Sequence, residues 1–239
     1  MKKLEFAANI ISRIIDAGLA LVFVLFLLIG AYVMTDMLYI YSGAAQRGAL
    51  VYKPKGNKEE SADLRELSED CVGWLTFDGT GIDYPLMQGR SNSEYLNTDP
   101  FGEYSLSGSV FLDASNRRDF TDRYCLLYGH HMEGGAMFGA LDRYTDGEYL
   151  KDHSEGTLTL TDGTVYKLKI FAVLSCRARD AEMFDIGAGG PTWEYLSEHA
   201  IVLLKDPKEA WPEQILAMTT CRGAETEDRL AVLAEMIKE

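Results

Sequence analysis

Residues 157–176 read TLTLTDGTVYKLKIFAVLSC and predict two β-strands joined by a tight turn. Polar and apolar residues alternate on both sides of the Asp-Gly pair at 162–163, which is typical of a two-residue hairpin turn. In the second strand Tyr166, Leu168 and Ile170 share one face, and lysines occupy the other. The stretch therefore predicts a hairpin that covers a core with one face only.

Similar short runs lie on both sides of this hairpin, separated by Gly, Asp, Asn and Ser. They are CVGWLTF (71–77), IDYPLMQ (82–88), GSVFLDA (108–114), RYCLLYGH (123–130), QILAMTTC (214–221) and RLAVLAEMI (229–237). One helix-compatible stretch, PTWEYLSEHAIVLL (191–204), predicts an excursion from the sheet. About eight short strands at this spacing favour a mostly β fold, a closed β-barrel with short peripheral helices and no unpaired edge.

An uncharged apolar run, AGLALVFVLFLLIGAYVM (17–34), precedes all the strands. Its 18 residues are about the shortest run able to cross a hydrocarbon core of about 30 Å, and residues up to Tyr41 extend it with only Asp36 charged. A cleaved signal peptide has a shorter apolar core, so a retained transmembrane helix is the better interpretation. Two lysines and Arg13 precede the run, which predicts a cytoplasmic N-terminus and an extracellular domain.

These patterns divide the chain into four predicted parts. Residues 1–16 form a cytoplasmic or interfacial segment with isoleucines at helical spacing, and 17–41 form the transmembrane anchor. The small and then charged residues at 42–60 predict a stalk. Residues 61–239 form the extracytoplasmic domain, which begins with a short amphipathic helix.

The composition restricts the class of function. The 239 residues are 47% hydrophobic and 25% charged, which is typical of a globular protein rather than a disordered one. The formal net charge of −14 argues against nucleic-acid binding, because phosphate contacts need clustered Lys and Arg.

Four cysteines outside the cell would ordinarily suggest two disulfides, with three possible pairings. Their positions form neither a CxxC pair nor a metal-binding pattern, and we expect no metal or organic cofactor. Cys125 and Cys176 lie in apolar runs, which favours buried and unreactive thiols. Cys71 carries no such indication, and Cys221 differs from all three.

Cys221 ends a predicted strand and precedes a polar loop, RGAETED, so its thiol is expected at the barrel rim. An isolated cysteine is more often a spare thiol, and a nucleophile needs a proton partner. His130 also ends a predicted strand, and an imidazole can take the thiol proton and later protonate a leaving amine. His131 would face the other side of that strand, and spacing alone does not choose between the two. We expect His153 and His199 to be solvated or structural.

Arg229 starts the next strand, eight residues after Cys221. A short loop between neighbouring strands brings both rims together, so its guanidinium can reach an oxyanion that forms at the thiol. The alternative is a surface ion pair with Glu225, Glu227 or Asp228. Arg222 is a second candidate, but it adjoins the cysteine and is expected to point away.

An ordered set of motifs resembles the class B sortases from about Asp70 to the C-terminus. The set comprises IDYPLMQ, NSEYLN (92–97), GSVFLDAS, LYGHHMEGGAMFGAL (127–141), and TTC with an arginine eight residues later. In that family the catalytic histidine directly follows the glycine, which implies His130 here. The resemblance also implies substrate positioning by Thr220, and a sorting-signal groove that involves Asn92, Leu96 and the excursion between 177 and 204. Arg222, bulky and charged directly after the cysteine, departs from the family pattern.

The resemblance implies a membrane-anchored cysteine transpeptidase. Its partners would be secreted proteins with a C-terminal sorting signal, cleaved after Thr through a Cys221 thioester, and an amine acceptor on a peptidoglycan cross-bridge or a pilin lysine. One alternative is a cell-wall cysteine peptidase that hydrolyses its substrate, although such enzymes usually carry the nucleophile at a helix N-terminus with the His later in the chain. The other is a non-catalytic membrane-tethered barrel that binds a partner.

Overall fold

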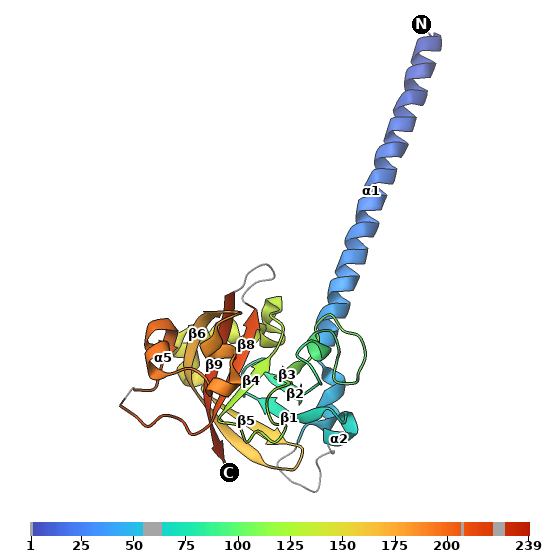
Figure 1. Cartoon of the computed structure of the whole chain (residues 1–239). Helices are drawn as coiled ribbons and strands as arrows, with labels where there is room; N and C mark the ends of the chain where they lie inside the picture. The colour runs from blue at the N-terminus through green and yellow to red at the C-terminus, as the bar shows by residue number, and fades with distance from the viewer. Residues whose placement is uncertain (1, 55–63, 207, 222–227) are drawn as a thin grey trace. The chain divides into compact units, whose positions relative to one another are not determined.

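The computed structural model describes residues 2–54, 64–206, 208–221 and 228–239 (Figure 1). It divides into two units: the first ends at Tyr41 and the second begins at Ser42. The first unit is formed by helix α1 (Lys2–Ala44), whose last residues belong to the second unit. Within the described residues α1 is the one helix long and apolar enough to cross a membrane. It is continuous, so the described part of the predicted segment 1–16 and the whole of 17–41 lie in one helix.

The start of the predicted stalk, 42–54, packs against the domain. Ala44 and Ala49 are fully buried, and Gln46 Nε2 donates a hydrogen bond to the Gly108 carbonyl at 3.0 Å. Small side chains explain the difference, because Ala and Gly let the backbone approach the domain closely. The 3₁₀ helix η1 (Arg47–Tyr52) lies in this segment. The remainder of the predicted stalk falls outside the described residues.

The second unit contains one nine-stranded sheet. Its order is β5-β1-β2-β3-β4-β8-β9-β6-β7, and β5 also pairs with β6, so every strand but β7 belongs to a closed ring. The strands are β1 (Cys71–Thr76), β2 (Asp83–Met87), β3 (Val110–Leu112), β4 (Tyr124–Tyr128), β5 (Glu155–Leu160), β6 (Val165–Arg177), β7 (Ala200–Leu203), β8 (Ile215–Cys221) and β9 (Asp228–Lys238). The predicted mostly β fold with a closed eight-stranded barrel is confirmed.

One short helix precedes the first strand and others lie between the strands (Figure 1). They are α2 (Leu64–Leu67), η2 (Glu94–Leu96), η3 (Glu133–Gly135), η4 (Phe138–Thr145), α3 (Gly147–Asp152), α4 (Ala181–Phe184), η5 (Ile186–Ala188) and α5 (Trp193–His199). The helix-compatible stretch 191–204 contains both α5 and β7, so its second half is a strand, which pairs with Ala172–Leu174 of β6.

The hairpin of β5 and β6 has the predicted facing but a longer turn. Tyr166, Leu168 and Ile170 are buried, whereas the intervening lysines are exposed. The Leu160 N–H donates to the Thr164 carbonyl at 2.8 Å, which leaves three residues in the loop instead of two. Gly163 has φ +85°, and a glycine in the left-handed region is what a three-residue hairpin loop requires at this point.

Alternation along the strands separates the buried apolar residues into three cores. One core fills the barrel and receives a fully or almost fully buried residue from every ring strand: Leu75, Leu86, Leu112, Leu127, Leu158, Leu168, Met218 and Val232. A second core lies on the outer face of β4, β6, β8 and β9, where residues of α4 and α5 such as Met183 and Leu196 cover it. A third contains residues of β1, β2 and β3 that pack with Leu64 and Leu67 of α2. The second core places the α4–α5 excursion over one face of the barrel wall.

Cys125 and Cys176 are buried, as their apolar runs predict. Cys71 is buried as well, and no disulfide joins Cys71, Cys125 and Cys176 to one another. Burial raises the pKa of both Cys125 and Cys176 to about 12. A thiol with so high a pKa carries little thiolate at neutral pH, which makes these two poor nucleophiles.

Candidate active site

The ends of β4 and β8 lie side by side because these strands pair in parallel. Tyr128 is the register partner of Thr219, and the Gly129 N–H donates to the Thr219 carbonyl at 3.2 Å. His130 follows Tyr128 by two residues, and Cys221 follows Thr219 by two residues. Since paired strands advance in step, the backbones of His130 and Cys221 reach the same end of the barrel.

The start of β9 joins them there. In the antiparallel pairing of β8 with β9, Cys221 is the direct register partner of Arg229. The backbone of Cys221 is described, and its side chain lies outside the described part of the chain. The three residues that the sequence proposes for catalysis therefore come from three neighbouring strand ends at one rim.

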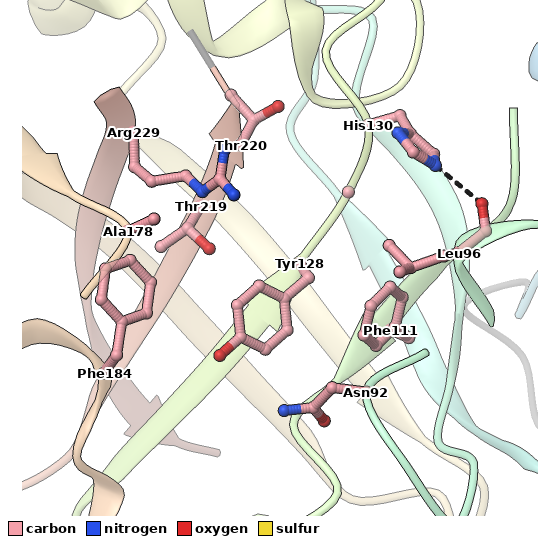
Figure 2. A pocket seen from close by; sticks show the side chains of 11 residues that line it. Asn92, Leu96, Phe111, Tyr128, His130, Ala178, Phe184, Thr219, Thr220 and Arg229 are labelled. Carbon is pink, nitrogen blue, oxygen red and sulfur yellow. Dashed lines mark hydrogen bonds between the residues drawn. The ribbon is translucent and has the colours of Figure 1, made fainter. Parts of the chain in front are cut away.

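A pocket of about 260 Å³ opens at this rim (Figure 2). Its lining residues are Asn92, Leu96, Phe111, Tyr128, Gly129, His130, Ala178, Phe184, Thr219, Thr220 and Arg229. Figure 2 shows His130 and Leu96 on one side and Arg229 and Thr220 on the other, with the Tyr128 ring between them. An extended peptide that lies over Tyr128 would pass between the imidazole and the guanidinium.

The His130 ring has a defined orientation. Its Nε2 lies 2.7 Å from the carbonyl oxygen of Leu96. A carbonyl oxygen only accepts hydrogen bonds, so Nε2 carries a hydrogen and donates it. The other ring nitrogen, Nδ1, is left to exchange a proton with a substrate or a thiol. Figure 2 shows this nitrogen on the side of the ring away from Leu96.

Of the two adjacent histidines, His130 is the one that lines the pocket. His131 Nε2 lies 2.7 Å from Asp142 Oδ2, and His131 forms an isolated β-bridge with Met137. His153 and His199 each stack on a tyrosine four residues earlier in the chain. All four histidines are in the described part of the chain, and only His130 lines the pocket.

Gly129 allows a close contact that holds the His130 backbone. A Cβ at position 129 would lie 2.8 Å from two ring atoms of Phe138, closer than real side chains come. The Phe138 N–H in turn donates to the His130 carbonyl at 3.0 Å. The Gly-His pair of the sequence therefore has a steric reason, because only glycine leaves room for the Phe138 ring.

The floor of the pocket is aromatic. The Tyr128 ring lies 5.4 Å from the Phe111 ring and is stacked at 6.4 Å on Phe184 of α4. Burial raises the pKa of Tyr128, the Asp113 carboxylate raises it further, and Arg229 opposes the shift. The hydroxyl therefore stays protonated and donates to Asp113 Oδ2 at 2.9 Å.

Every sequence-predicted site residue with a described side chain lines this pocket, namely Asn92, Leu96, His130, Thr220 and Arg229. Ala178 and Phe184 come from the predicted excursion. Sequence reasoning did not single out Phe111, Tyr128 or Thr219. Tyr128 could have been predicted to line the pocket, since it lies two residues before His130 and so faces the same side of the strand. Phe111 could not have been predicted in this way, because its pairing with Tyr128 depends on the register between β3 and β4.

The described residues contain no group of three or more His, Cys, Asp or Glu side chains arranged to hold a metal ion. The chemistry that the pocket lining supports is proton transfer at His130 and stabilisation of negative charge by Arg229.

Comparison with known proteins identifies the family. The sortase domain model matches residues 75–237. Sortase B of Listeria monocytogenes is 40% identical over 117 residues, a match that covers 48% of this chain and about half, 47%, of that protein. Sortase B of Staphylococcus aureus is 29% identical over 180 residues, which are 73% of each chain.

Solved structures give the same result. A class B sortase of Streptococcus pyogenes involved in pilus biogenesis is 32% identical with a TM-score of 0.66, and the match covers 77% of this chain and all of that one. The complex of Staphylococcus aureus sortase B with its substrate is 26% identical with a TM-score of 0.62, covering 73% of this chain and 83% of that one. With a family match over most of the domain and class B enzymes as its relatives, the chain belongs to the sortase family, among the class B cysteine transpeptidases.

Proposed function

We propose that this chain is a membrane-anchored class B sortase that cleaves the C-terminal sorting signal of a secreted protein after a Thr and joins that protein to an amine. The observation that carries the proposal is the convergence of three strand ends on one pocket. His130 and Arg229 line that pocket, and the backbone of Cys221 pairs with Arg229. The roles of individual residues given below are parts of the same proposal.

The first half-reaction forms a thioester. The Cys221 thiolate attacks the carbonyl carbon of the substrate Thr, and the carbonyl π electrons move to oxygen. As the tetrahedral intermediate collapses, the C–N bond breaks and protonated His130 gives its Nδ1 proton to the leaving amine. The hydrogen bond from His130 Nε2 to Leu96 supports this assignment, because it leaves Nδ1 as the exchanging nitrogen.

The second half-reaction releases the product. An acceptor amine attacks the thioester carbonyl, neutral His130 takes a proton from the amine, and the Cys221 thiolate departs. Two acceptors fit this chemistry, an amine of a peptidoglycan cross-bridge and a lysine of a pilin. Asn92, Leu96 and Thr220 are proposed to hold the sorting signal, and their shared position in the lining of the pocket supports this.

We propose that Arg229 stabilises the oxyanion of both tetrahedral intermediates. An Arg229→Lys variant keeps the positive charge but loses the planar fork of donors. We expect kcat for a fluorogenic sorting peptide to fall by about 10²-fold or more, the size measured for loss of one oxyanion donor, with a smaller change in KM. Steady-state kinetics on the folded variant measures both constants. A kcat within threefold of the parent would remove Arg229 from the oxyanion role.

The anchor has a physical purpose in this proposal. Helix α1 has the length and composition of a membrane span, and the excess of basic residues before the apolar run favours a cytoplasmic N-terminus with the catalytic domain outside. Confinement to one membrane surface raises the effective concentration of the enzyme toward secreted substrates and wall precursors.

A product analysis tests transfer against hydrolysis. The full chain in detergent micelles is incubated with a panel of peptides that each contain one Thr, with and without triglycine or a lysine-containing peptide. We expect mass spectrometry to find cleavage after Thr and, with the matching amine, a new amide that joins the two fragments. If the peptide is hydrolysed and the added amine is not incorporated into the product, the cysteine peptidase alternative is favoured. Absence of turnover together with an unreactive Cys221 would favour the non-catalytic barrel.

A further inference from the structure

The segment from Asn92 to Leu96, which supplies two residues of the pocket lining, is held at both of its ends. At one end the Leu96 carbonyl accepts the hydrogen bond from His130 Nε2. At the other end Asn92 Nδ2 donates to Asp113 Oδ2 at 2.7 Å. The segment therefore connects the imidazole to a carboxylate that is not itself in the pocket lining.

Asp113 is buried, with only 4% of its surface exposed, and its carboxylate accepts three hydrogen bonds. Oδ2 receives the Asn92 amide and the Tyr128 hydroxyl, the latter at 2.9 Å, and Oδ1 receives the Ser115 N–H at 2.8 Å. Two of these three donors, Asn92 and Tyr128, are pocket-lining side chains from distant parts of the sequence.

The amide of Asn92 is fixed in one orientation. Its Oδ1 accepts the Ala114 N–H at 2.7 Å, while its Nδ2 faces the carboxylate. If the amide were flipped, Oδ1 would face the negative carboxylate and Nδ2 would face an N–H donor, and both contacts are repulsive. Asp113 and Ala114 thus fix the orientation of the amide, with Nδ2 toward the Asp113 carboxylate and Oδ1 toward the Ala114 N–H.

We propose that Asp113 is a positioning residue of this site, which acts on the substrate through Asn92 and, in a supporting way, through Tyr128. The inference rests on the proposed function, because it needs the sorting signal to contact Asn92. A carboxylate suits the position because it only accepts hydrogen bonds, and both side-chain partners donate. An asparagine at 113 would offer one oxygen in place of two and turn an NH₂ group toward a donor.

The competing explanation is that Asp113 only stabilises the turn after β3. Its bond to the Ser115 N–H is a local contact that an aspartate commonly makes in a turn. If that bond were the only role of Asp113, its substitution would lower the stability of the fold and would affect no single step of the reaction selectively. The two explanations differ in kinetics, since a smaller folded fraction lowers the apparent kcat and leaves KM for the peptide unchanged.

The test is a double-mutant cycle on the full chain with Asp113→Asn, Asn92→Ala and the double variant. We expect each single variant to lower kcat/KM for the sorting peptide by about ten- to a hundredfold, mainly by raising KM for that peptide. KM for the acceptor amine should stay unchanged, because the amine reacts after the signal is bound. The double variant should lie close to Asn92→Ala, since a residue that acts mainly through Asn92 then has only the supporting contact with Tyr128 left to position. Losses that multiply in the double variant, or a parental KM in Asp113→Asn, would overturn the proposal.

A matched control is available in Asp122. Its Oδ2 accepts from the Asn116 side-chain amide at 2.9 Å and from the Arg117 N–H, so it makes the same kinds of contact away from the pocket. Asp122→Asn should lower the melting temperature without raising KM. If Asp113→Asn is not recovered folded, Asp113→Glu replaces it in the cycle with the same expectation, because the added CH₂ displaces the carboxylate. Failure of the proposed function is recognised separately, by a parent chain that does not turn over the peptide or by a Cys221→Ala chain that does.

Discussion

Cys221→Ala is expected to abolish thioester formation and to reduce peptide turnover to the uncatalysed background while the barrel stays folded. Alanine provides no nucleophile, and the other three thiols are buried away from the pocket lining. The backbone pairing of position 221 with Arg229 does not depend on the side chain, so β8 and β9 should pair as before. Removal of a nucleophile typically costs several powers of ten in kcat, about 10⁶-fold in the best-studied hydrolases.

The measurement is intact-protein mass spectrometry after mixing with a sorting peptide, alongside a fluorogenic turnover assay. The parent chain should gain the mass of the acyl fragment, and the variant should not. Cys71→Ala is the matched control, because it removes a buried thiol outside the pocket lining and should retain both acylation and turnover. An acyl adduct on the Cys221→Ala chain would show that the nucleophile is a different residue.

His130→Ala is expected to lower kcat by about 10²- to 10⁴-fold, the usual contribution of a positioned acid–base group. In the proposed mechanism the variant loses both the base that helps to form the thiolate and the acid that protonates the leaving amine. The proposal also predicts slower alkylation of Cys221 by a small electrophile at neutral pH, since the imidazole is proposed to take the thiol proton and only the thiolate is the nucleophile.

The neighbouring histidine provides the control for this prediction. His131→Ala removes an imidazole at the adjacent position, but that imidazole pairs with Asp142 and does not line the pocket. We expect its kcat to stay within a few-fold of the parent. An inactive His131→Ala chain together with an active His130→Ala chain would reverse the assignment of the proton partner.

Local physics explains what was predictable about the fold. Alternation along 157–176 indicated which face is buried, because side chains in a strand point to opposite sides regardless of distant contacts. The same reasoning found the strands around Trp74 and Leu127 and the apolar surroundings of Cys125 and Cys176. The turn at Asp162-Gly163 was placed correctly but one residue short, because Asp-Gly suits both two- and three-residue loops and the register decides between them.

Packing decided what the pattern of residues 42–60 did not. Small and polar residues are typical of a linker, yet Ala44 and Ala49 are fully buried against the domain. Small residues suit both a linker and a packed segment. They leave the backbone flexible where no surface is near, and they allow the backbone to approach a surface closely where one is present. Only the presence of that surface separates the two.

The sequence by itself determined the chemical groups of the proposed site, a strand-ending Cys221, the imidazole after Gly129 and an arginine at the start of the next strand. It also brought Cys221 and Arg229 together, because strands joined by a short loop become neighbours. The tertiary structure alone decided that β4 lies parallel to β8 and brings His130 to the same end, and that Asp113 holds Asn92. Pairing between segments far apart in the chain depends on the whole barrel closing in one register, and no local pattern carries that information.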